Sequence, residues 1–479
     1  MFKLNPVAAL LAASLTAAAG SALALPVADF NSTPGDTVEL FVSGATAQEN
    51  GLRRTVARMC AVGSLDIYRF TNQEAGFCTI NKTVVTGTPA SVTKMVVYKS
   101  GVGGSGNGVQ PVADAANLAF ISMAALKATP ALVTGPSTSV APVAPNAPDT
   151  IGIPGYVTTL VAITATQSVP TEAGFSDVEP GLLGASPAQT GRLQVTAPNV
   201  LLFGVPVTIA ARNALQSAQG LTVGSETEAN MPSLRRNLIA SVYTGNITNW
   251  SQLGATLADD VIYLATRVET SGTQKTFNVY VTGAACSAGV QAIVLNNATA
   301  GDCTTAGTPG NTVFAGSGSG NVTACLEGHN TNSRGAFGVL SMEFVPGATG
   351  AGNGYRFIKI DSFAPTLVNT VNGNYNFWVE PTFQYRKAPS ASPLAGVKKT
   401  VADRIVAQLG TEAVISSLNN SFAQTWGSSG LLAKPSSANA PLVVVPPVSA
   451  VQVAGNPTNA FTKSPFGSPN NCQAPVLFN

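Results

Sequence analysis

Apolar and polar residues alternate along this chain in a recurring order. Residues 36–42 change between apolar and polar at successive positions, which predicts a strand, and residues 94–99 form a second strand rich in β-branched side chains. A short glycine-containing turn and then a helical pattern follow each strand; Leu52, Val56 and Met59 show the helical spacing most clearly. Strand, turn and helix in this order predict the βαβ units of a parallel sheet.

Further segments continue this order and place the chain in the α/β class. Strands are predicted at 118–121, 200–210, 261–266 and 335–340, and helices at 232–244, after the turn 316–321, and at 400–418. Between about 129 and 198 the composition changes to Pro, Ala, Val, Thr and Ser with few charges. We interpret this stretch as a loop-rich insertion.

The first residues predict export from the cytoplasm. Lys3 precedes an apolar run from Pro6 to Ala19 that is too short for a stable membrane span, and Ala22-Leu23-Ala24 has the Ala-x-Ala form of a cleavage site. Residues 1–24 therefore have the pattern of a secretory signal peptide. No later stretch is long and apolar enough to predict a membrane span. We expect a periplasmic or secreted protein.

Composition narrows the range of ligands. Charged residues make up only 10% of the 479 residues, against about 25% in a typical globular protein. Apolar residues supply 45%, so the low charge does not indicate disorder. A formal net charge of +2 gives no electrostatic reason to bind nucleic acid or an anionic membrane. An anion would have to be bound by a few local groups.

Six cysteines follow the predicted cleavage site, and an even number favours disulfides in an oxidising compartment. Cys60 and Cys78 are the favoured pair because the loop between them is short and contains glycine. For the other four, three sets of pairings remain open. The chain has no Cys-x-x-Cys pair and one histidine, so we expect neither a metal site nor a cofactor. The four cysteines are Cys286, Cys303, Cys325 and Cys472.

Arg267 and the segment Ser271-Gly272-Thr273 form the sharpest chemical signal, between a predicted strand and a helix. A helix that begins near Ser271 directs its free N–H groups and positive dipole end at the preceding turn. The two hydroxyls are further donors, Gly272 permits close approach, and the Arg267 guanidinium matches a tetrahedral oxyanion. The alternative is an ordinary Ser/Thr helix cap beside a surface arginine.

Two other turns have the same character, 43–46 after the first predicted strand and 103–108 after the second. Each alone is weak evidence, because glycine-rich turns are common in parallel sheets. Open α/β sheets, however, bind their ligands at the carboxyl ends of strands, where all three turns are expected. Together the three turns predict an anion socket.

On these segments the chain resembles the phosphate-binding proteins of bacterial phosphate uptake (PstS-like), including the related secreted phosphate binders with an altered N-terminus. The resemblance lies in short blocks that keep their order along the chain. The blocks are the Gly-Ala-Thr turn at Ser43-Gly44-Ala45-Thr46, the Gly/Ser loop at 98–109, the second-lobe signature at 243–250, Arg267 with Ser271-Gly272-Thr273, and the segments 316–321 and 335–339.

This resemblance implies the type 2 fold of periplasmic binding proteins. Two α/β lobes with mixed sheets flanked by helices would be joined by two crossover strands, with the ligand between them. The first lobe would comprise residues 25–200 and 376–479, including the insertion, and the second lobe residues 201–375.

The resemblance also implies a set of ligand-binding residues. Thr46, the amide of Ala47, and Ser105 (or the amide of Gly104) would bind from the first lobe. From the second lobe it implies Arg267, Ser271, Gly272 and Thr273, with Glu269 in the position of an acidic residue that orients the arginine.

Two positions depart from the family pattern. The family has an Asp after a Ser just past the short apolar strand, where it accepts the proton of hydrogen phosphate. Alignment without gaps from Val109 places Ser122 and Met123 there. Methionine cannot replace that acceptor, so either another group supplies it, or discrimination against sulfate is weaker, or the ligand differs. Ala47 also stands where the family has an aromatic residue.

Other polar and aromatic candidates receive structural interpretations. His329, the only histidine, is expected in a loop, because no Gly-x-Ser-x-Gly segment supplies a nucleophile. Arg53 and Arg54 are expected on a solvated helix face, and Trp250 in the packing of the second lobe. We therefore predict a binding protein and not an enzyme.

The first hypothesis is a monomeric binding protein for phosphate or a similar small oxyanion, with an ABC permease as the partner that the resemblance implies. The second is a secreted or surface interaction protein that keeps the fold with a degenerate pocket; Met123 and Ala47 motivate it. A hydrolase is disfavoured, because the sequence offers neither a set of metal ligands nor a nucleophile with its base.

Overall fold

The computed structural model describes most of the chain from residue 35 onward. The described residues are 35–70, 72–128, 133–136, 157–161, 166–287, 290–291, 293–294, 298–307, 310–347, 354–445, 447–465 and 467–478, with Val27 and Phe30. The predicted signal peptide, residues 1–24, lies outside them. None of the helices in these ranges combines the length and the apolar character that a membrane span requires.

The largest sheet has nine strands around β1 (Thr37–Gly44). This strand pairs in parallel with β4 (Lys94–Ser100) and with β9 (Ala173–Ser176). Helix α13 (Gly396–Leu409) packs beside it, and α2 (Glu49–Met59) packs on α13. The remaining strands continue the sheet on both sides: β10 (Leu193–Thr196), β21 (Thr382–Arg386), β3 (Gln73–Thr79), β2 (Asp66–Phe70), β7 (Val157–Val161) and β6 (Val133–Pro136).

A second sheet of five strands is built on β14 (Tyr263–Arg267), which lies between β15 (Val313–Gly316) and β16 (Ala336–Gly338). Trp250 is fully buried in this unit and stacks on Phe337 with ring centroids 4.8 Å apart, as its predicted packing role requires. The other elements of this unit are β12 (Pro206–Thr208), β18 (Tyr355–Phe357), α7 (Ile209–Ala218), α8 (Arg236–Tyr243), α9 (Gly272–Phe277) and α11 (Ser319–Thr331).

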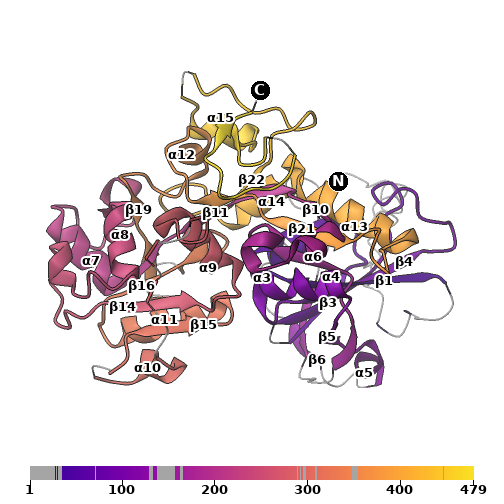
Figure 1. Cartoon of the computed structure of the whole chain (residues 1–479), viewed down its shortest axis with the longest axis horizontal. Helices are drawn as coiled ribbons and strands as arrows, with labels where there is room; N and C mark the ends of the chain where they lie inside the picture. Colours follow the sequence, from indigo (N-terminus) through magenta and orange to yellow (C-terminus); the bar gives the residue numbers. More distant parts are fainter. Residues whose placement is uncertain are drawn as a thin grey trace, which may run out of the picture.

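The chain passes from the first sheet to the second through β11 (Asn199–Gly204) and returns through β20 (Trp378–Val379), and these two strands pair antiparallel. β17 (Leu340–Ser341) and β22 (Leu431–Ala433) complete a small sheet with them. Figure 1 shows the two α/β units side by side, with the C-terminal segment above their junction. The unit of the nine-stranded sheet is called the first lobe below, and the unit of the five-stranded sheet the second lobe. The mixed α/β class with sheets flanked by helices is confirmed.

The predicted insertion was only partly right. β6 and β7 extend the edge of the nine-stranded sheet, and β8 (Thr166–Pro170) pairs antiparallel with β5 (Asn117–Ile121). β9 and β10, however, belong to the body of the nine-stranded sheet. Low charge made residues 166–198 look like a loop, but β9 acquires its strand partners from β1 and β21, which lie far away in sequence.

The single late helix predicted at 400–418 is two helices, α13 and α14 (Glu412–Ser421), which break at Gly410. A Cβ atom at Gly410 would lie 2.4 Å from the backbone oxygen of Pro198. Glycine is therefore required by a close backbone approach, and a helical pattern in the sequence does not register such an approach.

Three disulfides join the six cysteines. Cys60 is bonded to Cys78, as predicted, and the structure chooses Cys286–Cys472 and Cys303–Cys325 among the open pairings. The Cys286–Cys472 bond ties the C-terminal segment to the second unit. Cys303 and Cys325 lie close to His329, but their sulfur atoms are bonded to each other and so do not act as thiolate ligands.

His329 does not lie in a loop, and that prediction was wrong. It belongs to α11, is 2% exposed, and stacks on Tyr263 with ring centroids 4.6 Å apart. Burial, with a smaller contribution from the charge of Arg334, lowers the pKa of its imidazole to about 3. The ring is therefore neutral in the folded protein at ordinary pH.

We expect His329 to make the fold sensitive to acid. Its pKa is about 3 when folded and about 6.5 when unfolded, so between these values only the unfolded chain gains a proton. The free energy of unfolding should fall by up to ~1.4 kcal/mol for each pH unit below about 6.5. Urea denaturation of wild type and His329→Gln checks this: the stability advantage of wild type should shrink between pH 7 and about pH 4.5. An advantage independent of pH would contradict it.

Candidate functional site

Arg267 is the last residue of β14, and only 3% of it is exposed. Its guanidinium donates hydrogen bonds to the carbonyls of Gly316 (3.1 Å) and Ser317 (3.0 Å) and to the hydroxyl of Ser319 (2.8 Å). Among the described residues, no carboxylate oxygen forms an ion pair with it within 4.0 Å, and burial lowers its pKa to about 10. The arginine is a desolvated cation that neutral groups hold in place.

The segment predicted to accompany Arg267 begins helix α9. The Ser271 hydroxyl caps this helix by accepting a hydrogen bond from the amide of Gln274 at 3.4 Å. The Thr273 hydroxyl accepts a long hydrogen bond (3.4 Å) from Arg267. Ser271 and Thr273 are both buried. Of the two hydroxyls, that of Thr273 contacts the arginine and that of Ser271 caps the helix.

The glycine-rich loop of the first unit meets this segment. Its residues Gly104–Asn107 form α3, and the amide of Gly106 donates a hydrogen bond to the carbonyl of Thr270 at 3.1 Å. A Cβ atom at Gly272 would lie only 2.3 Å from the Ser105 hydroxyl. The two lobes therefore touch at this point, and Gly272 permits the approach. The structure brings together the predicted residues Ser105, Arg267, Ser271, Gly272 and Thr273.

Thr46 and Ala47 lie at the edge of this cluster. They form the 3₁₀ turn Thr46–Gln48 directly after β1, and Ala47 is buried. The Thr46 methyl lies 2.8 Å from the place where a Cβ atom of Gly101 would be. Within the described residues neither Thr46 nor Ala47 forms a hydrogen bond with the second lobe. The structure places them on the first-lobe side of the contact, without a direct link to Arg267.

Asp177 is the residue of this cluster that the sequence analysis missed. It follows β9, is 2% exposed, and its Oδ2 accepts a hydrogen bond from the Thr273 hydroxyl at 3.0 Å. Its amide donates a hydrogen bond to the Ser105 hydroxyl at 3.2 Å, so Asp177 contacts both lobes. Oδ1 is buried and has no hydrogen-bond partner in the described structure. Burial raises the pKa of Asp177 to about 6, against the opposing effects of Thr273 and the charge of Arg267.

Met123, which the alignment without gaps places at the acidic position of the family pattern, lies away from this cluster. It begins α5 (Met123–Ala128) and packs in a separate core with Phe77 and Phe120. The sequence does contain a Ser-Asp pair at the end of a short apolar strand, namely Ser176-Asp177, where Ser176 is the last residue of β9. The alignment missed this pair because a long segment, residues 122–172, precedes it and the alignment allowed no gap. A search for Ser-Asp after every apolar strand would have found it.

Glu269 does not orient the arginine. Its carboxylate pairs with Lys275 and its side chain is 70% exposed. Two carbonyls and a hydroxyl orient Arg267 instead. Lys275, on helix α9, lies within reach of the flexible Glu269 side chain. The closeness of Glu269 to Arg267 along the chain therefore did not predict the partner of Glu269.

Arg53 and Arg54 are buried, so the predicted solvated helix face was wrong. Arg53 forms ion pairs with Glu74 at 2.7 Å and with Glu49 at 3.3 Å. Lys99, buried nearby, donates a hydrogen bond to the carbonyl of Gly44 at 2.9 Å and lies 3.8 Å from Glu49. Arg53 and Lys99 thus have carboxylates close by, in contrast to Arg267.

Comparison with known proteins finds only remote structural likenesses. No family model and no curated protein matches the chain. Among solved structures, it is similar to a candidate phosphate ABC transporter substrate-binding protein from Clostridium perfringens with bound phosphate, at 14% identity and a TM-score of 0.41, over 81% of this chain and 97% of that one. PstS from Borrelia burgdorferi is similar at 10% identity and a TM-score of 0.36, over 82% and 98%. At this identity the likeness concerns the fold alone.

Proposed function

We propose that this protein captures phosphate or a similar small oxyanion between its two lobes. The observation that carries the proposal is Arg267, a buried cation at the contact between the lobes without a carboxylate in ion-pair range among the described residues. An unpaired buried charge costs about 3–5 kcal/mol. A bound oxyanion would supply an ion-pair partner for the guanidinium, and the Ser319 hydroxyl, which accepts a hydrogen bond from Arg267, has its own O–H left to donate to that anion.

Asp177 supports a protonated oxyanion as the ligand. A carboxylate with a buried, unpartnered oxygen needs a donor, and hydrogen phosphate carries an O–H group whereas sulfate does not at neutral pH. Sulfate would place a second acceptor against the Asp177 carboxylate. We infer that the site prefers phosphate or arsenate to sulfate.

Capture would depend on closure of the lobes. Arg267 is held rigidly on the second lobe by the Gly316 and Ser317 carbonyls, so the anion meets a preorganised cation. Ser105, with Thr46 and the amide of Ala47, would then approach from the first lobe. The proposal includes no turnover. We propose that the protein works outside the cytoplasm, a location that its three disulfides support. There it would act as a monomer and deliver its ligand to an ABC permease.

Titration calorimetry of protein freed of bound ligand, with phosphate, arsenate and sulfate, tests this function. We expect phosphate and arsenate to bind with dissociation constants near micromolar, equivalent to about 8 kcal/mol, and sulfate to bind at least ~100-fold more weakly. Absence of heat with all three anions, together with no change in Tm, would contradict the proposal. That result would favour a surface interaction protein with a degenerate pocket.

A further inference from the structure

A cavity of about 270 Å³ lies at the junction of the C-terminal segment with the rest of the molecule. Helices α12 (Leu367–Val371), α14 and α15 (Ala450–Gly455) converge on it, and Figure 1 shows α12 and α15 next to each other above the two lobes. Its volume is just below the range of roughly 300–1,000 Å³ that is typical of sites for small organic ligands. An occupant would therefore be small.

The walls of this cavity combine apolar and neutral polar side chains. The larger apolar ones are those of Trp426, Leu367, Val453 and Pro457, and the neutral polar ones include Thr366, Ser416, Asn420 and Ser428. Asn419 also lines it, but its amide is already bonded to both backbone groups of Leu431. The cavity thus presents an aromatic ring and aliphatic groups beside neutral hydroxyl and amide groups, with little hydrogen-bonding capacity left in Asn419.

Glu228 is the only charged side chain among the residues that line the cavity. It accepts one long hydrogen bond from Asn369 at 3.5 Å and takes part in no ion pair within the described residues. A carboxylate beside an aromatic wall matches a cation with an apolar body, because the ring face and the carboxylate both attract positive charge. An anionic occupant would be repelled.

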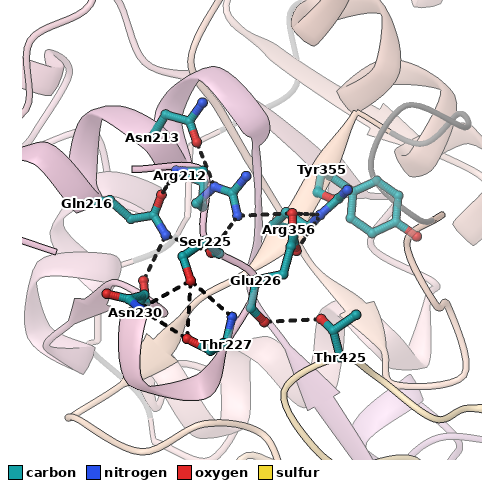
Figure 2. A network of polar contacts seen from close by, with 11 residues as sticks. Arg212, Asn213, Gln216, Ser225, Glu226, Thr227, Asn230, Tyr355, Arg356 and Thr425 are labelled. Carbon is teal, nitrogen blue, oxygen red and sulfur yellow. Dashed lines mark hydrogen bonds and ion pairs between the residues drawn. The ribbon is translucent and has the colours of Figure 1, made fainter. Parts of the chain in front are cut away.

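Figure 2 shows a network of polar contacts around Glu226, close in sequence to the cavity residue Glu228. The carboxylate of Glu226, two residues before Glu228, accepts hydrogen bonds from the buried Arg212 (3.2 Å) and Arg356 (2.9 Å). The carbonyl of Glu226 accepts a hydrogen bond from the Thr425 hydroxyl at 3.1 Å, one residue before Trp426. The loop with the carboxylate and the turn with the indole are therefore tied together, which preorganises the cavity.

We propose that this cavity binds a small organic monocation, an amine with one aromatic or branched apolar group. The apolar group lies against Trp426 and the ammonium lies at Glu228. The site shares no residue with the oxyanion cluster and does not depend on the proposed function. Its walls come from the segment between the crossover strands (Glu228, Leu367) and from α14, which packs on α2 of the first unit. A ligand there contacts elements attached to both lobes.

Three probes of nearly identical shape test the charge requirement: benzylamine, benzyl alcohol and benzoate. Binding is measured by calorimetry and by intrinsic tryptophan emission, since Trp426 lines the cavity whereas Trp250 and Trp378 are buried elsewhere. We expect saturable binding of benzylamine, binding of benzyl alcohol about tenfold weaker, and none of benzoate. Absence of saturation with benzylamine, or benzoate binding as well as benzylamine, would overturn the proposal.

Two variants locate the site. Ala454→Trp places a large side chain in the wall from an exposed helix position and should abolish benzylamine binding, whereas Ala218→Trp, on the exposed end of α7, should not change it. Glu228→Gln should bring benzylamine and benzyl alcohol to about equal affinity, since it removes the attraction between the carboxylate and the ammonium group. Benzylamine binding that survives Ala454→Trp, or a preference for the amine that survives Glu228→Gln, would disprove this placement.

Discussion

Replacing Arg267 by methionine should raise the dissociation constant for phosphate by about tenfold to a hundredfold. The change removes the cation and the one guanidinium N–H that makes no hydrogen bond with the described residues. A charge-assisted hydrogen bond contributes about 1.5–3 kcal/mol, and tenfold in affinity corresponds to about 1.4 kcal/mol. Calorimetry of Arg267→Met measures this loss. Arg267→Lys should lose an intermediate amount, because lysine keeps the charge without the planar fork.

The same variant should weaken the ligand-free fold only moderately. Methionine removes the desolvation cost of the guanidinium, but it also removes the hydrogen bonds to the carbonyls of Gly316 and Ser317. Urea denaturation of ligand-free Arg267→Met should give a free energy of unfolding about 1–3 kcal/mol below that of wild type. Arg235→Met, at an exposed arginine, is the matched control and should leave phosphate affinity unchanged. Phosphate affinity retained in Arg267→Met would refute the proposed role of the arginine.

Replacing Asp177 by asparagine should change the ratio of phosphate to sulfate affinity by at least ~100-fold in favour of sulfate. The amide has the shape of the carboxylate and can keep its oxygen toward the Thr273 hydroxyl, so its NH₂ group takes the place of the unpartnered Oδ1. A donor at that position suits sulfate and removes the acceptor for the proton of hydrogen phosphate. Competition titrations with both anions measure the ratio.

Met123 provides the control for this experiment. It is the residue that an alignment without gaps places in the acidic position, yet it packs in a core with Phe77 and Phe120 away from the lobe contact. Met123→Leu should therefore leave the ratio of phosphate to sulfate affinity as in wild type. A ratio unchanged by Asp177→Asn, or changed equally by Met123→Leu, would show that Asp177 does not select the ligand.

Features that depend on near neighbours in the chain could be predicted. The alternation at β1 and the β-branched run at β4 predicted strands at their observed places, and the short loop between Cys60 and Cys78 favoured the observed disulfide. Arg267 and Thr273 are six residues apart across one strand end and one helix start, so their contact follows from the turn that joins them. Trp250, in a segment of turn and cap residues, was correctly expected to pack.

Features that depend on strand partners far away in sequence could not be predicted in this way. β9 becomes a strand of the main sheet by pairing with β1 and β21, and its weakly patterned residues gave no sign of this. The burial of Arg53 depends on Glu74, which a different strand supplies. The burial of His329, on helix α11, depends on Tyr263 of strand β14, whose ring stacks on the imidazole.

By itself the sequence determined the α/β class, the order of most strands and helices, and an arginine followed by hydroxyls at the start of a helix, since each of these is set by residues within a few positions of one another. Only the tertiary structure decided that Asp177 and Ser105 meet that arginine segment from the other lobe, and that Glu269 does not contact the arginine. Those contacts depend on how strands far apart in the chain are paired and how the two sheets are brought together: β9, which precedes Asp177, pairs with β1, and Asp177 contacts Thr273, 96 residues later. Local spacing carries no information about such distances.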